Sequence, residues 1–489
     1  MYTNLLASPY VHVGALLPII LLLVTLLTNI IIPVALRHRH VQTVSFLVTL
    51  VGLGLTWWQT KPPAEPCVAI WHNLLQHTHW TTITQLLSIG ITLVMVAVMY
   101  QEDKLYPAKE NLSLIFVLVL LLGAYLLPIS QHWLMVYTSV TFITIASTVL
   151  IYSHTNHQQG IVRSQQYLLY SSAIASGFML FGISYVYGYT GSLDVSQGLI
   201  AATHAAGWGR QIAQIGFVLA LGGVLMLLGS FPYQFWVADV YTTAPCYLVA
   251  YLSTITKVVV IGWMGHLCYT LHVTEVATHF LMFRNLLPII ATITMGIGHF
   301  AALRTQHVGK LFAYGGIAQT GALLALLVPD VSSYRHMVYY LVVYSIMNMA
   351  SWLSLGLLYK NVNSFHLADY TGLGKKFPIV SACITVSTLA LIGLPPTSGF
   401  IAKFVLLNKL WECVQQTPSG ATTILWMASI LGTIMALYYY LRVPYTLFSR
   451  DKKPNTTTVV REETWVQWIV VVLACLLIAL VLAFWQRKL

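Results

Sequence analysis

The chain has 489 residues, of which 58% are hydrophobic and only 8% are charged, and its formal net charge is +11. Soluble globular domains carry about 25% charged residues, so this composition excludes an ordinary soluble domain and indicates a membrane protein. The six cysteines are scattered, with no CxxC pair and no metal-site spacing, so nothing in their pattern predicts a bound metal.

Apolar runs follow one another along nearly the whole chain. A helix needs about 20 mostly apolar residues to cross the hydrocarbon layer of a membrane, and about fourteen runs approach that length. They lie near residues 13–36, 41–58, 82–100, 112–127, 133–153, 166–188, 210–231, 244–271, 280–300, 310–328, 336–359, 377–408, 422–447 and 464–486. A closed barrel would show alternating strands instead. We therefore expect an all-α polytopic membrane protein with about 14 transmembrane helices in a single membrane domain.

The lysines and arginines between these runs are unevenly distributed. Most fall on the side of the membrane that holds Arg37, and few fall on the opposite side. An excess of basic residues marks the cytoplasmic or matrix side, so we expect both termini on the outer side. This orientation accounts for the positive charge and argues against a nucleic-acid partner.

Prolines interrupt the seventh and the twelfth apolar runs. A proline removes a backbone donor and collides with the preceding turn, so Pro232 and the pair Pro395 and Pro396 break their helices. A kink used only for packing is the alternative. Helices broken at corresponding places in two halves are typical of inverted-repeat transporters. We expect three N-terminal helices, two inverted five-helix repeats and a last helix, at residues 1–111, 112–271, 280–447 and 464–486.

Two lysines lie inside apolar runs: Lys257 in the eighth, and Lys403 just past the double proline in the twelfth. An ionisable group in hydrocarbon is costly unless it faces a cavity or a partner, so such residues are usually functional. Burial weakens the hold of an ammonium on its proton, which suits a proton relay. The structural alternative is a lysine that snorkels to the interface or pairs with carbonyls. His266, further along the eighth run, is another relay candidate, with a carbonyl-bonded histidine as the alternative.

Four stretches carry a family resemblance. The most specific is "DYTGLGKKFPIVSACITVSTLALIGLPPTSGFIAKF" at 369–404, and "GSFPYQFWVADVYTTAPCYLVAYLSTITK" at 229–257 resembles a PFHxW-PDVYEGAP pattern that leads to a lysine. Together with 175–194 and 301–321, they resemble the antiporter-like subunits of respiratory complex I, the NADH–ubiquinone oxidoreductase, in their chain 2 (bacterial subunit N) type. The resemblance covers roughly residues 110–450.

The resemblance implies a proton-translocating membrane-arm subunit that passes protons along intramembrane lysines and waters. Lys257 matches the family's central lysine, and Lys403 matches the terminal lysine that exchanges protons with the outer side. Redox chemistry belongs to other subunits, so we expect no catalytic residue, metal or cofactor here; the NADH, FMN, iron–sulfur and ubiquinone sites lie elsewhere. The implied partners are a neighbouring antiporter-like subunit, small membrane subunits and lipids.

Two charged positions of the family are absent from this chain. The family's lysine in the seventh helix is Leu227 here, and its glutamate in the fifth helix is Thr138 or a near neighbour. Losing both together avoids an uncompensated buried charge. Two family histidines are also replaced, by Gln234 and Gln319. Without this charged pair, the proton affinity of the central lysine is set by neutral groups, by waters or by a neighbouring subunit, or this control is absent.

Three functions remain open after this reading. The chain is a proton-translocating subunit of complex I, a structural subunit of complex I that no longer pumps, or a subunit of an Mrp-type cation/proton antiporter. The lost pair supports the structural function, whereas Lys257, Lys403 and the broken twelfth helix oppose it. Sparse charge and decayed motif positions predict a mitochondrial inner membrane as the location, with a bacterial plasma membrane as the alternative.

Overall fold

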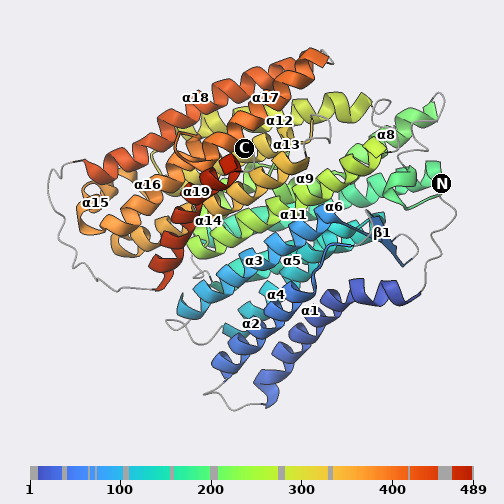
Figure 1. Cartoon of the computed structure of the whole chain (residues 1–489), viewed down its shortest axis with the longest axis horizontal. Coiled ribbons are helices and arrows are strands. Elements are labelled where there is room, and N and C mark those ends of the chain that lie inside the picture. Colours follow the sequence, from blue (N-terminus) through green and yellow to red (C-terminus); the bar gives the residue numbers. More distant parts are fainter. Residues whose placement is uncertain are drawn as a thin grey trace. The chain divides into compact units, whose positions relative to one another are not determined.

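The protein is almost entirely helical (Figure 1). A computed structural model describes residues 9–35, 41–63, 67–71, 74–102, 110–154, 159–198, 208–273, 281–328, 334–416, 419–449 and 465–486. The all-α expectation is confirmed, because each predicted apolar run coincides with helix. Helices suit a medium without water, since they satisfy their backbone polar groups internally.

Eleven helices in the described part of the chain are long and apolar enough to cross a membrane. The segments Pro378–Ile392 and Trp465–Val481 are shorter apolar helices. The predicted number of about fourteen transmembrane helices therefore stays a prediction. Both chain ends lie outside the described residues, and so does their predicted placement on the outer side.

The chain divides into two compact units, of which the first contains residues 1–153, 172–227 and 258–276. Its helices are α1 (Pro9–Ala35), α2 (Val41–Gln59), α3 (His79–Glu102), α4 (Glu110–Leu126), α5 (Trp133–His154), most of α6 (Gln159–Thr190), α8 (Trp208–Ala220), α9 (Gly222–Leu228) and the second part of α11 (Cys246–Val273). The 3-10 turn η2 (Leu127–Ile129) follows α4.

A two-stranded hairpin in the first unit was not predicted. Strands β1 (Cys67–Ile70) and β2 (Leu75–Thr78) pair antiparallel, with Cys67 opposite Thr78 and Ile70 opposite Leu75. The hairpin lies between the second and third apolar runs, in a stretch whose four-residue strands are far too short for a membrane span. Leu75 forms an isolated bridge with Ser130, so the hairpin is tied to the segment that precedes α5.

The second unit contains residues 154–171, 228–257 and 277–489. Its helices are α10 (Phe235–Thr243), the first part of α11, α12 (Leu281–Arg304), α13 (Val308–Ala325), α14 (Tyr334–Val362), α15 (Leu373–Lys376), α16 (Pro378–Ile392), α17 (Ser398–Gln416), α18 (Gly420–Phe448) and α19 (Trp465–Gln486), with the 3-10 turn η5 (Leu367–Tyr370). Helix α13 lies against α12, α10 and α18. The two units do not follow the predicted repeat borders, and the repeats stay a prediction.

Two interruptions in the helices share one backbone plan. We call residues 229–234, between α9 and α10, the first break, and residues 393–397, between α16 and α17, the second break. Each opens on a glycine with positive φ, +60° at Gly229 and +85° at Gly393, where a side chain would be strained. Each then runs as Gly-x-x-Pro, and the peptide bonds before Pro232 and Pro396 are cis. Both breaks belong to the second unit.

Candidate functional site

Lys257 is buried in the second unit, with a side chain only 2% exposed. Its Nζ donates to the carbonyl of Gly316 on α13 and to the hydroxyl of Tyr344 on α14, both at 3.0 Å. No carboxylate of the described residues pairs with it. The dipoles of a carbonyl and a hydroxyl therefore stabilise this cation in place of an acidic partner. Among the described residues, the ammonium group of Lys257 therefore forms hydrogen bonds only with uncharged groups.

A second layer of hydrogen bonds holds the surroundings of Lys257. The Tyr344 hydroxyl donates to the carbonyl of Ser253 at 3.3 Å, which leaves its oxygen free to accept from the lysine. The amide of Asn348, on α14, donates to the hydroxyls of Ser253 and Thr254, each at 2.7 Å. Helices α11 and α14 are thus joined by side-chain hydrogen bonds on the face that carries Lys257, which fixes the direction of its ammonium group.

Lys403 caps the second break. Helix α16 ends at Ile392, and the Nζ of Lys403 donates to the Ile392 carbonyl at 2.9 Å. The amide of Gln319, on α13, donates to the neighbouring carbonyl of Leu391 at 3.1 Å. A Cβ at Gly393 would lie 2.8 Å from Cδ of Lys403, so the glycine also makes room for the lysine stem. The carbonyls that the break frees are thereby satisfied by a cation and an amide.

Hydroxyl groups cap the first break. The backbone N–H of Phe231 donates to Oγ1 of Thr294 on α12 at 3.0 Å. Oγ1 of Thr320, on α13, lies 3.3 Å from the Leu228 carbonyl at the end of α9 and 3.0 Å from the carbonyl of Gly316. A hydroxyl has one hydrogen, so Thr320 serves these two carbonyls in turn. No charged group of the described residues takes part in these bonds.

One short stretch of α13 therefore serves both lysines and both breaks. Gly316 accepts from Lys257, Gln319 donates to the Leu391 carbonyl near the end of α16, and Thr320 reaches the Leu228 carbonyl at the end of α9. The side-chain oxygen of Gln319 also accepts from the Tyr340 hydroxyl at 3.2 Å, so both ends of its amide are engaged.

A small cavity of about 20 Å³ lies beside Lys403. Its polar lining comes from six side chains, those of His299, Gln319, Tyr340, Lys403, Ser429 and Thr433. A cavity needs about 10–15 Å³ to hold one water molecule, so this one has room for a bridging water. A space large enough for one water molecule, lined by both polar and apolar side chains, therefore lies beside Lys403.

His266 lies in the first unit and is 2% exposed. Its Nε2 lies 2.5 Å from Nε2 of Gln131, whose amide also reaches Oε1 of Gln76 at 2.6 Å. Its Nδ1 is buried without a hydrogen-bond partner among the described residues. The ring of His266 is therefore hydrogen-bonded to Gln131, which in turn bonds Gln76, and the role of His266 as a relay stays a prediction.

The two positions that are predicted to have lost a family charge, Leu227 and Thr138, lie in different environments. Leu227 is buried in α9, with 4% of its surface exposed. Thr138 is exposed on α5, where its hydroxyl donates to the Met135 carbonyl at 3.0 Å. Helix α5 carries no acidic residue at all. Of the options predicted for control of Lys257, the structure provides neutral groups in direct contact, Gly316 and Tyr344.

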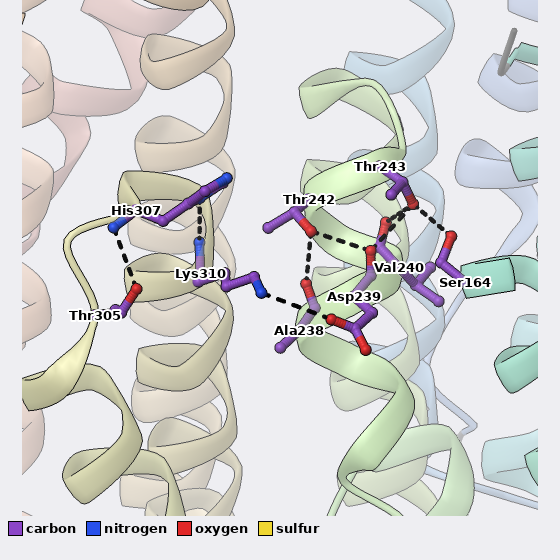
Figure 2. Close-up of polar contacts among 9 residues, drawn as sticks. All are labelled: Ser164, Ala238, Asp239, Val240, Thr242, Thr243, Thr305, His307 and Lys310. Atoms are coloured by element: carbon purple, nitrogen blue, oxygen red, sulfur yellow. Dashed lines mark hydrogen bonds and ion pairs between the residues drawn. The ribbon is translucent and has the colours of Figure 1, made fainter. Parts of the chain in front are cut away.

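An ion pair links α10 and α13 outside this buried region. Nζ of Lys310 lies 3.9 Å from Oδ1 of Asp239, with side chains 40% and 47% exposed (Figure 2). His307 caps α13 by accepting from the Lys310 N–H, and burial, followed by the nearby Lys310 charge, lowers the pKa of His307. Pairs this exposed are worth about 0–1 kcal/mol, so the contact helps position α10 and adds little stability.

Sequence reasoning found the two lysines and the prolines but missed most of their partners. Tyr344, Asn348 and Thr320 are ordinary polar residues in apolar runs, and nothing local distinguishes them. His299 had a usable signal, because it is a histidine inside the apolar run 280–300. In the described part of the chain, no group of three or more His, Cys, Asp or Glu residues could hold a metal ion.

Comparison with known proteins gives consistent results. The family described as NADH:quinone oxidoreductase/Mrp antiporter, transmembrane, matches residues 130–432. NADH-quinone oxidoreductase subunit N 2 of Chloroherpeton thalassium is 30% identical over 386 residues, which cover 76% of this chain and 72% of the relative.

Two solved structures share the fold of nearly the whole chain. A chain of respiratory complex I from Thermus thermophilus with bound aureothin superposes with a TM-score of 0.75 at 22% identity, covering 95% of this chain and 97% of that one. A chain of the Mrp complex from Dietzia sp. superposes with a TM-score of 0.79 at 17% identity, covering 97% and 95%. At these identities the superpositions show the fold, and they do not distinguish a complex I subunit from an Mrp subunit.

Proposed function

The chain belongs to the NADH:quinone oxidoreductase/Mrp antiporter transmembrane family, and on that premise we propose that it is a subunit N-type, proton-translocating membrane subunit of an NADH:quinone oxidoreductase. Its own contribution is proton transfer within the membrane. The oxidation of NADH and the reduction of quinone belong to other subunits of the complex, together with the FMN and iron–sulfur groups.

The observation that carries this proposal is the setting of the two lysines. Lys257 and Lys403 each donate to a backbone carbonyl, and no carboxylate among the described residues neutralises either. An ammonium held only by dipoles can give up its proton without leaving an unpaired buried acid behind. A cation needed solely for structure would gain more from an acidic partner. Lys403 also borders a cavity with polar and apolar side chains in its wall and room for a water molecule.

Helix α13 lies beside both lysines and provides a direct route for proton transfer between them. Tyr344 and the Gly316 carbonyl hold the ammonium of Lys257 at one face of α13. Gln319, about one turn further along α13, borders the Lys403 cavity. We propose that protons pass from the Lys257 region to Lys403 along this helix by way of water, and leave through the second break.

The alternative function, a structural subunit that does not pump protons, is favoured by two features of the chain. Leu227 is buried and apolar, and α5 has no acid, so the charged pair that modulates the central lysine in relatives has no counterpart at these positions. A subunit of that kind would assemble into the complex without pumping. The antiporter alternative has the shared fold in its favour, whereas the subunit N relative at 30% identity supports a redox complex.

The expected partners and location follow from the same family. We propose that the chain assembles with other membrane subunits of the complex and with lipids. Multi-pass insertion agrees with the eleven helices able to cross a membrane in the described part of the chain. The predicted compartment is an energy-coupling membrane, either the mitochondrial inner membrane or a bacterial plasma membrane, and the bacterial relatives support the second.

The test compares proton translocation per NADH oxidised in vesicles that carry Lys257→Met or Lys403→Met, with assembly checked on native gels. We expect both variants to assemble and to pump fewer protons. The matched control is Lys409→Met, because Lys409 lies on α17 with Lys403 but pairs with Glu412 at 2.6 Å on a more exposed face. Unchanged pumping in both variants would support the structural alternative. Copurification without any NADH-oxidising subunits would support the antiporter.

A further inference from the structure

A second ionisable side chain, that of His299, lines the cavity beside Lys403. His299 lies on α12, is 6% exposed and belongs to the second unit. Of the six polar side chains that line the cavity, Lys403 and His299 are the two whose nitrogens can bind and release a proton. The third nitrogen-bearing side chain is Gln319, whose amide does not titrate and is engaged at both ends.

Helix α18 holds the neighbours of both ring nitrogens of His299. Its Nδ1 lies 3.2 Å from the hydroxyl of Tyr439 on α18, which fixes the orientation of the ring. The other nitrogen, Nε2, faces Gly432 of α18, because a Cβ added there would lie 2.5 Å from it. Gly432 has no side chain to cover Nε2, and the cavity-lining residues Ser429 and Thr433 flank it on the same helix.

We propose that His299 is a proton-relay residue that exchanges protons with Lys403 through a water held in this cavity. The inference rests on the proposed function, because it assigns a partner to Lys403. In the transfer, the ammonium of Lys403 gives a proton to the water while the water gives one to Nε2 of His299, and the reverse step restores both groups. No other bond is made or broken.

This assignment explains how the chain operates with a glutamine on α13. A relay across the cavity needs a titratable group opposite Lys403, and Gln319 cannot provide one. His299 stands on another wall of the same 20 Å³ space, so the titratable group is supplied by α12 instead. A single bridging water suffices in a space of this size, since about 10–15 Å³ holds one water.

The test uses His299→Gln in the assembled complex, with proton translocation per NADH oxidised as the measurement. We expect His299→Gln to lose the same share of translocation as Lys403→Met. The double variant His299→Gln with Gln319→His should recover at least half of that loss, because it returns a titratable ring to the same cavity from another wall. Met295→Leu, which alters an apolar lining residue, is the control and should pump normally.

The outcomes separate the relay from the proposed function. Normal pumping in His299→Gln with a loss in Lys403→Met would overturn the relay and leave the proposed function standing. A loss without recovery in the double variant would make His299 a structural residue and also overturn it. Normal pumping in Lys403→Met would overturn the relay, and normal pumping in Lys257→Met as well would also remove the proposed function. If His299→Gln fails to assemble, Gly432→Val is the second variant, because its Cβ would lie 2.5 Å from Nε2 and displace the ring. It should cause the same loss, and normal pumping there would refute the relay.

Discussion

The first and second breaks have the same backbone plan and different chemistry. Each opens on a left-handed glycine and reaches a cis proline through Gly-x-x-Pro. At the first break, the hydroxyls of Thr294 and Thr320 serve the freed backbone groups. At the second, the ammonium of Lys403 donates to the Ile392 carbonyl. The comparison teaches that a helix break inside a membrane protein needs a polar cap, but the cap need not be charged, so a charged cap has another purpose.

The largest expected effect distinguishes a cap from a proton carrier. Lys403→Arg keeps a cation that can donate to the Ile392 carbonyl, but a guanidinium stays protonated. We expect the variant to assemble and to lose translocation to the same extent as Lys403→Met. Proton translocation per NADH, with native gels for assembly, provides the measurement. Full pumping by the arginine variant would reduce Lys403 to a cap and make the two breaks equivalent.

The next prediction compares the two glycines. Gly229→Ala and Gly393→Ala each force a side chain into the left-handed region, which costs about 1–3 kcal/mol. We expect both to lower the thermal stability of the complex. Gly393→Ala should also reduce pumping, because its Cβ would lie 2.8 Å from Cδ of Lys403. The control is Gly420→Ala, since nothing lies within 4 Å of a Cβ there. Equal pumping losses in both variants would contradict the distinction between the breaks.

A smaller effect is expected at the neutral cap. Thr320→Val keeps the shape and removes the hydroxyl that reaches the Leu228 and Gly316 carbonyls. Loss of such a hydrogen bond costs about 1–3 kcal/mol when a buried acceptor is left without a partner. We expect a lower midpoint of thermal unfolding with pumping largely kept. A pumping loss as large as that of Lys403→Arg would show that the first break also carries protons.

The smallest effect is expected outside the breaks. Asp239→Asn removes the partially exposed pair with Lys310, which is worth under about 1 kcal/mol. We expect no change in pumping and a small stability change that shrinks further at high salt. Thermal unfolding at two salt concentrations checks this. A clear loss of pumping would give this pair a role that its exposure does not suggest.

The sequence alone could predict what depends on local rules. Pro232, Pro395 and Pro396 break helices wherever they occur in an apolar run, and a lysine in such a run is conspicuous by its cost. The helices themselves follow from apolar length. The hairpin of β1 and β2 escaped because its strands are short and fall between the runs.

Partners that are distant in the chain could not be predicted. Gln319 reaches Leu391 across 72 positions, and Thr320 reaches Leu228 across 92. No periodicity reports such contacts, because they depend on which helices pack together. The sequence identifies Gln319 only as the replacement of a family histidine, whereas in the structure its amide donates to the Leu391 carbonyl near the end of α16. His299 was detectable as a polar residue in a span, but its place beside Lys403 required the fold.

Thr320 and Lys257 share a hydrogen-bond acceptor, the carbonyl of Gly316. Its single hydrogen can point to Leu228 or to Gly316, and the Gly316 carbonyl is also the acceptor of Lys257. An ammonium competes for that carbonyl more strongly than a neutral amine does. If Lys257 changes its protonation state as proposed, the hydrogen bonding of the Gly316 carbonyl changes with it, and Thr320 connects that carbonyl to the end of α9.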